Sequence, residues 1–280
     1  MDVKEPSSVQ IAGRKIAYDE ARPANRADEK GTILLLTGLA SKRLGWVRQL
    51  DVFGREYRTL ALDHRDTGDS DQVAEDYTPS DLADDAAAVL SALGIAHAHV
   101  VGISLGGFAA LQFALRHPEM LDKLVLVSTS AGGRAHVPAS PEIVALLTPE
   151  PGLEVGERAI RGYSKIMAAE FVAAHPEAFE QIAATARYRP QSAAGYGRQL
   201  RASLAHDVVD ELHRISAPTL VIHGDLDPLV PAANGAYLAA HIPGARHTVY
   251  SGVGHIPIVE RADDFNHDVL AFLANEDATP

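Results

Sequence analysis

The sequence predicts an α/β fold with a mostly parallel sheet, and three observations support this class. Short apolar runs recur along the chain, and segments with helical spacing of apolar residues lie between them. Most of these runs are apolar at nearly every position, which is typical of strands buried on both faces of a parallel sheet. Residues 131–212 carry helical patterns and no convincing strand, so a helical insertion between two core strands is expected.

The expected strands begin with a hairpin and continue as buried runs. Gly13 and Arg14 separate two short alternating segments, which is typical of a β-hairpin. The next segment, ARPANRADEKG, is polar and contains proline, so we expect a loop before the first buried strand. The strands are expected at residues 9–11, 15–18, 32–36, 59–62, 99–101, 124–128, 219–223 and 246–250.

Helix signals lie between these runs. Thr78 is suited to the N-cap of the first clear helix, Pro79 to its first position, and Asp81 to the positive end of its dipole. Gly94 follows the last apolar position and is expected to end this helix. Further helices are expected at residues 105–116, 231–240 and 263–274, and within the insertion at 141–147, 157–171, 176–186 and 195–203.

Composition excludes several classes of function. The chain has 280 residues, 46% of them hydrophobic, and a formal net charge of −12. An acidic surface repels phosphate backbones, so nucleic-acid binding is not expected. Because the sequence has no cysteine, disulfides, cysteine nucleophiles and thiolate metal sites are excluded. The polar first residues and the lack of an apolar run of about 20 residues predict a cytoplasmic protein without a membrane span.

The segment Gly102-Ile103-Ser104-Leu105-Gly106 matches the pattern G-x-S-x-G. It follows an expected strand and precedes an expected helix, which is the context of a nucleophile elbow. The sharp turn strains the serine backbone and exposes its hydroxyl, and the glycines relieve crowding around it. A purely structural turn is the alternative interpretation of this pattern.

A serine nucleophile needs a base and an orienting carboxylate, and both residue types follow later strands. His255 lies in a glycine-flanked loop after residues 246–250, where catalytic groups of open parallel sheets collect. Asp225 and Asp227 both follow residues 219–223, and one of them is expected to form the turn. We favour Asp227 as the acid, because it directly precedes a proline that could begin the next helix. The chain order Ser104, Asp227, His255 is the order of this architecture.

With these motifs in place, the sequence resembles the α/β-hydrolase superfamily, in its esterase/lactonase-like branch with a helical cap. The motifs are LLLTGLAS, LDHRDTGDS, VVGISLGG, HGDLDPLVP and GVGHIPIVE. Within the superfamily the chain is similar to hydrolases of the aclacinomycin methylesterase group. The resemblance implies an eight-stranded, mostly parallel sheet with helices on both faces. It also implies a hydrolase core at residues 1–130 and 213–280, and a cap at 131–212.

The resemblance implies a role for each site residue. Ser104 would be the nucleophile, His255 the general base and acid, and Asp227 the acid that orients it. The backbone N–H groups of Leu39 and Leu105 would form the oxyanion hole. No cofactor and no metal are required.

Several residues are expected around the pocket, and two positions depart from the family pattern. Gly38, Trp46 and Ile256 are expected near the pocket, and for Trp46 the alternative role is to anchor its helix. Thr37 stands where many relatives have histidine, and Asp66 stands where many have glycine. Arg65, Asp66, Gly68 and Ser70 of the DHRDTGDS segment are expected to hold a loop through side-chain hydrogen bonds, with direct substrate contact as the alternative. Tyr163 and Tyr196 of the insertion are candidate polar contacts, with packing as the alternative.

The expected function is hydrolysis of a carboxylic ester or lactone of a small to medium apolar substrate. The same three residues also support cofactor-free perhydrolysis and hydrolysis of carbon–carbon bonds in dienoic ketones. From a different class, a non-catalytic ligand receptor could use this fold. The expected partner is a small molecule, and the sequence contains no signal for an oligomeric state.

Overall fold

The computed structural model describes residues 5–148 and 152–275 and contains one eight-stranded sheet. The strand order is β1-β2-β4-β3-β5-β6-β7-β8. Strand β2 pairs antiparallel with β1 and β4, whereas the remaining neighbours pair in parallel. The predicted hydrolase core (residues 1–130 and 213–280) and cap (residues 131–212) include residues 1–4, 149–151 and 276–280, which lie outside the described residues. The sheet confirms the predicted fold class.

Each predicted strand lies on an observed one. Strand β3 is buried at every position, as its continuous apolar run predicts. Strand β8 is mostly exposed because it forms one edge of the sheet, and its sequence is correspondingly less apolar. The strands are β1 (Ser7–Ile11), β2 (Arg14–Ala21), β3 (Thr32–Leu36), β4 (Arg58–Leu62), β5 (Ala98–Ile103), β6 (Leu121–Val127), β7 (Thr219–Gly224) and β8 (Arg246–Tyr250).

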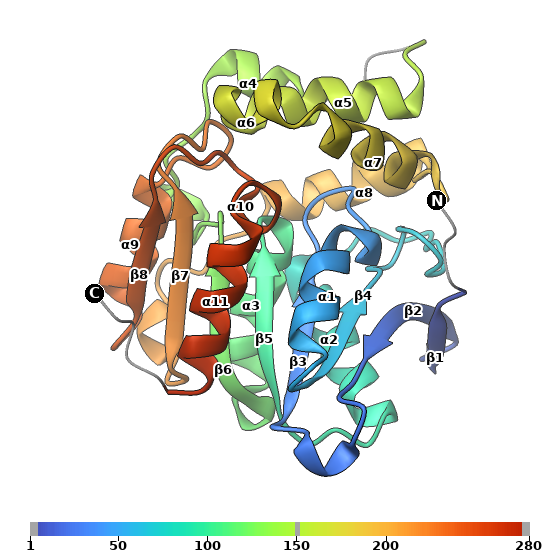
Figure 1. The fold of residues 1–280 in the computed structure, drawn as a ribbon, viewed down its shortest axis with the longest axis vertical. Coiled ribbons are helices and arrows are strands. Elements are labelled where there is room, and N and C mark those ends of the chain that lie inside the picture. Colours follow the sequence, from blue (N-terminus) through green and yellow to red (C-terminus); the bar gives the residue numbers. More distant parts are fainter. Residues whose placement is uncertain (1–4, 149–151, 276–280) are drawn as a thin grey trace.

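Helices cover both faces of the sheet and bury two apolar clusters against it (Figure 1). The N-terminus of α2 forms as predicted, because the Asp81 carboxylate accepts hydrogen bonds from the backbone N–H and the hydroxyl of Thr78. Helices α1 (Val47–Phe53) and α11 (Ala262–Leu273) cover one face. Helices α2 (Pro79–Ala92), α3 (Leu105–Arg116) and α9 (Ala233–His241) cover the other.

The remaining helices lie between β6 and β7 in the chain, except for α10 (Pro257–Glu260). In Figure 1 they form a layer beyond the carboxyl ends of the parallel strands. They are α4 (Pro141–Ala145), α5 (Val155–Ile166), α6 (Ala169–Ala174), α7 (Pro176–Arg187) and α8 (Ala193–Leu204). We call α4–α8 the inserted helices.

The prediction of one helix over residues 157–171 is wrong. The chain leaves helical geometry at Met167, and the Ala168 N–H donates to Glu260 at 2.8 Å. The carbonyl of Ile166 accepts the His255 N–H at 2.8 Å. Two hydrogen bonds to residues far along the chain therefore replace helical hydrogen bonds at this point. The local spacing of apolar residues does not reveal such tertiary partners. The short helices α1 and α10 were also not predicted.

Candidate active site

The strand order places two loops at the centre of the site. The order reverses between β3 and β5, and ligands of open α/β sheets bind outside the carboxyl ends of strands at such a point. The loop after β3 and the turn after β5 therefore meet. A Cβ on Gly38 would lie 3.4 Å from the Cβ of Ser104. The loop backbone at Gly38 therefore lies directly beside the serine.

Ser104 lies at the strained turn between β5 and α3. Its φ of 54° and ψ of −119° lie outside the ordinary regions for an L-residue. A Cβ on Gly102 would lie 2.2 Å from the carbonyl oxygen of Gly106, and a Cβ on Gly106 would lie 2.2 Å from that of Leu36. Gly107 packs against Thr129, whose hydroxyl a Cβ would meet at 2.5 Å. The expected crowding around the turn is confirmed at Gly102 and Gly106, and Gly107 is equally crowded.

The structure brings Asp227 and His255 together. Oδ2 of Asp227 lies 2.8 Å from Nδ1 of His255, and both side chains are almost fully buried. Oδ1 of Asp227 accepts the N–H groups of Leu229 and Val230, each at 2.9 Å, so the carboxylate is held in one orientation. Asp225 instead accepts from the Gly252 N–H and the Ser251 hydroxyl, as a residue that ties two loops together.

His223 is a second imidazole beside Asp227, at 3.6 Å from Oδ2. Its Nε2 lies 2.9 Å from the carbonyl oxygen of Val230, to which it can donate. Burial lowers the pKa of His223 to about 4, against the opposing effect of Asp227. A neutral His223 that donates to a backbone carbonyl is consistent with a structural role.

Leu39 and Leu105, which line the same cavity as Ser104, have backbone N–H groups available as donors. Within the described part of the chain, neither the Leu39 nor the Leu105 N–H donates a hydrogen bond. Leu105 is the first residue of α3, where the helix dipole favours negative charge. Free donors at a helix N-terminus next to a serine can stabilise a developing oxyanion.

His64 is a residue of this site that the sequence analysis missed. It follows β4, and its Nε2 lies 3.2 Å from the carbonyl oxygen of Thr37, directly before Gly38. Burial lowers the pKa of His64 to about 4, so the imidazole is neutral and can donate this bond. His64 thereby holds the loop after β3 at Thr37. The only available signal was its place at the end of a strand, in the LDHRDTGDS motif.

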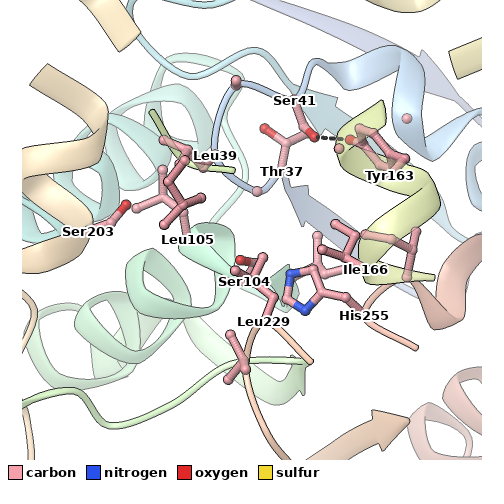
Figure 2. Close-up of a pocket in the computed structure, with 18 of the residues that line it drawn as sticks. Thr37, Leu39, Ser41, Ser104, Leu105, Tyr163, Ile166, Ser203, Leu229 and His255 are labelled. Atoms are coloured by element: carbon pink, nitrogen blue, oxygen red, sulfur yellow. Dashed lines mark hydrogen bonds between the residues drawn. The ribbon is translucent and has the colours of Figure 1, made fainter. Parts of the chain in front are cut away.

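Ser104 and His255 line a cavity of about 980 Å³ beneath the inserted helices. Figure 2 shows the imidazole of His255 pointing toward Ser104, with Ile166 and Leu229 nearby. Leu39 and Leu105 lie on another side of the same cavity. The lining is mostly apolar and also contains the three residues expected near the pocket, namely Gly38, Trp46 and Ile256.

Trp46 has both of the roles considered for it. Its side chain lines the cavity and is also buried, with its ring centroid 6.4 Å from that of Phe265 on α11. Tyr163 of α5 shares a hydrogen bond of 3.1 Å with Ser41, and burial raises the pKa of its phenol. Tyr196 lines the cavity and donates to the carbonyl of Leu147.

The segment DHRDTGDS pins its loop as expected. Arg65 pairs with Asp85 at 2.7 Å. Ser70 donates to the carbonyl of Asp63 and accepts the N–H of Ala17. Gly68 has a φ of 55°, and a Cβ there would collide with Asp63. These contacts confirm the structural interpretation of the segment, and Asp66 pairs with Arg198 of α8 at 2.8 Å.

Residues 5–148 and 152–275 contain neither a membrane-spanning helix nor a candidate metal-binding cluster. None of their helices combines the length and apolar character needed to cross a bilayer. Within the same residues, no cluster of three or more histidine, aspartate or glutamate side chains is placed to hold a metal ion.

A mostly parallel sheet with a serine at a strand-turn-helix junction and a His–Asp pair at the same edge defines the class of α/β hydrolases. The model of the family described as alpha/beta hydrolase fold matches residues 31–262. The chain therefore belongs to the alpha/beta hydrolase fold family and is a hydrolase.

Three similar proteins have names that describe different substrates. A protein of Caulobacter sp. (strain K31) named "Putative carbamate hydrolase RutD" is 30% identical over 253 residues, which are 90% of this chain and 94% of that protein. The 2-hydroxy-6-oxononadienedioate/2-hydroxy-6-oxononatrienedioate hydrolase of Burkholderia vietnamiensis is 31% identical, covering 92% of this chain and 91% of that protein. The crystal structure of the enol-lactonase from Burkholderia xenovorans LB400 has a TM-score of 0.83 and 26% identity, covering 96% and 100%.

Proposed function

We propose that this chain hydrolyses carboxylic esters or lactones of small to medium apolar substrates through an acyl-enzyme on Ser104. The observation that carries the proposal is the hydrogen bond between Asp227 and Nδ1 of His255. With this bond in place, the imidazole faces Ser104, and two backbone amides without an acceptor among the described residues lie on the same cavity. Nucleophile, base, orienting acid and oxyanion donors are thus available at one edge of the sheet.

In the first half of the reaction, Oγ of Ser104 attacks the substrate carbonyl carbon as His255 takes the hydroxyl proton. The carbonyl π electrons move to oxygen, where the N–H groups of Leu39 and Leu105 stabilise the charge by about 3 kcal/mol each. When the carbonyl re-forms, the carbon–oxygen bond to the alcohol breaks and His255 gives its proton to the leaving alkoxide. The acyl group remains on Ser104.

In the second half, water attacks the acyl carbon and His255 takes its proton. The same amides hold the second oxyanion, and the proton returns to Oγ of Ser104 as the acid leaves. Asp227 holds the imidazole in one tautomer and stabilises the imidazolium in both halves. Because His223 is neutral, Asp227 has one imidazolium partner during the cycle.

The cavity supports the apolar substrate class. Its lining is mostly aliphatic and aromatic, and residues 131–212 would act as a cap over Ser104. A polar Ser41–Tyr163 pair in the wall can hydrogen-bond one oxygen of the substrate. The similarity to an enol-lactonase structure also supports a lactone substrate. The cytoplasmic location expected from the sequence stays a prediction.

A substrate panel with Ser104→Ala tests this proposal. The panel contains p-nitrophenyl butyrate, an aliphatic lactone, an unsubstituted carbamate and a 2-hydroxy-6-oxo-dienoate. We expect the highest kcat/KM on the ester or the lactone, and none of these activities in Ser104→Ala, whereas Ser91→Ala on α2 should match the unmodified protein. A preference for the carbamate or dienoate would overturn the substrate class, and an active Ser104→Ala would overturn the mechanism.

A fluorophosphonate probe separates an enzyme from a ligand receptor. An activated serine should be labelled at one equivalent per chain, with the modification on the peptide that contains Ser104. Absence of labelling in protein that is folded by circular dichroism would favour a binding protein that uses the same cavity.

A further inference from the structure

Three consecutive residues of the loop after β3 are each bonded to a different inserted helix. We call residues 37–42 the oxyanion loop, because it carries the Leu39 amide. The Ala40 N–H donates to Oε1 of Gln199 on α8 at 2.8 Å. Ser41 shares its 3.1 Å hydrogen bond with Tyr163 on α5. The loop is therefore not held by the core alone.

The third contact is a pair of hydrogen bonds from Lys42 that caps the C-terminus of α7. Lys42 is buried, and its Nζ donates to the carbonyl oxygens of Thr185 and Ala186 at 3.0 and 3.2 Å. These carbonyls belong to the last turn of α7, where a positive charge interacts favourably with the helix dipole. Lys42 thereby fastens the oxyanion loop to a third inserted helix.

Ala40 is the position where such support matters most. Its φ of 57° is in the left-handed region, which an alanine occupies only when its surroundings hold it there. On the other side of Leu39, His64 holds the carbonyl of Thr37 from the core. The Leu39 amide thus lies between a bond to the core and the Gln199 bond to α8.

The acceptor oxygen of Gln199 has a second donor, and the residue before it is paired with the core. The Gln199 side chain is fully buried, and Gln191 donates a second hydrogen bond to its Oε1 at 3.3 Å. The preceding residue, Arg198, forms two hydrogen bonds to Asp66, at 2.9 and 2.8 Å. Asp66 is buried and has a φ of 67°. The ion pair therefore fixes α8 on the core next to the glutamine.

We propose that Gln199 is a positioning residue that sets the Leu39 amide in the oxyanion hole, and that the Asp66–Arg198 pair holds α8 in the register this requires. The inserted helices would then support the transition state as well as enclose the substrate. This inference rests on the proposed acyl-enzyme function. It assigns to Asp66 a role that glycine at that position could not have.

Gln199→Met tests the inference, because methionine keeps the length of the side chain and removes the acceptor for Ala40. We expect kcat on p-nitrophenyl butyrate to fall by about 10- to 100-fold, as expected when one oxyanion donor is misplaced. KM should stay within about twofold, because ground-state binding does not use the hole. The inhibition constant of a trifluoromethyl ketone, whose adduct with Ser104 carries the oxyanion, should rise in parallel with the loss in kcat/KM.

Gln199→Glu separates positioning from stability. A carboxyl group keeps an acceptor for the Ala40 N–H but is more costly to bury than methionine. We expect Gln199→Glu to retain more kcat than Gln199→Met while having the lower melting temperature. If activity followed stability in both variants, Gln199 would be a structural residue and the inference would be wrong.

Gln49→Met is the matched control, since Gln49 is also fully buried and donates to Ile258 and Asn266 in the core. It should lower the melting temperature and leave kcat unchanged. Asp66→Asn, which tolerates a positive φ, should lower kcat by about 2- to 10-fold and covers the case in which Gln199 variants do not fold.

The outcomes distinguish this inference from the function on which it rests. Unchanged kcat in Gln199→Met and Asp66→Asn, with Ser104→Ala inactive, would overturn only the positioning role. An unmodified protein without activity on the whole panel would overturn the proposed function, and the inference with it.

Discussion

Asp225 and Asp227 are two residues apart, yet the fold gives them different partners. The first accepts from Ser251 and Gly252 at the surface, and the second is buried against His255. Both stabilise the loops after β7 and β8, but only Asp227 can act on the imidazole. The choice between two neighbouring carboxylates depends on which one faces the interior.

Asp227→Asn should lower kcat for ester hydrolysis by about 10⁴-fold, because an amide favours the wrong tautomer of His255 and cannot stabilise its cation. Steady-state kinetics on p-nitrophenyl butyrate measure the effect. Asp225→Asn is the matched control, with a lower melting temperature and an unchanged kcat. Similar losses in both variants would contradict the assignment of Asp227.

At the level of single elements, buried lysines cap the C-termini of two helices. Lys42 does so for α7, and Lys123 of β6 does so for α11. Nζ of Lys123 donates to Phe272 and Leu273 at 2.8 Å each. Each lysine donates to carbonyls of the last helical turn, which is not followed by another turn of helical N–H donors.

Lys123→Met should lower the free energy of unfolding by about 1–3 kcal/mol, because buried carbonyls lose a charged donor. Urea unfolding followed by circular dichroism measures the difference. Lys30→Met, which removes an exposed ion pair with Glu56, should change it by less than about 1 kcal/mol. An equal effect of the two substitutions would show that the bonds to α11 contribute little.

Across the whole molecule, buried neutral histidines make stability depend on pH. Burial lowers the pKa of His64, His206 and His223 to about 4 each. In the unfolded chain a histidine has a pKa of about 6.5. Between these values the unfolded state binds more protons, so the folded state loses stability as pH falls. This contribution is fully present above about pH 6.5.

We expect the free energy of unfolding to decrease from pH 7 to pH 5, with each histidine contributing up to about 1.4 kcal/mol per pH unit. Urea denaturation at several pH values measures the slope. His64→Gln keeps a donor for Thr37 and removes one titrating group, so its slope should be shallower by that amount. A slope equal to that of the unmodified protein would rule out a neutral His64 in the folded state.

Much of the fold could be predicted because its signals are local. Buried parallel strands are continuous apolar runs, and α2 has its capping residues at both ends. The break between α5 and α6 could not be predicted, because its hydrogen bonds go to Glu260 and His255, far along the chain. Such partners leave no periodic trace in the sequence.

The sequence by itself determined the turn at Ser104 and the order of the serine, the aspartate and the histidine, because glycine spacing and strand ends are encoded locally. Only the tertiary structure decided that Asp227 rather than Asp225 meets His255, that His64 holds Thr37, and that Gln199 reaches Ala40. The physical reason is that these hydrogen bonds join residues brought together by the strand order and by the packing of the inserted helices on the core.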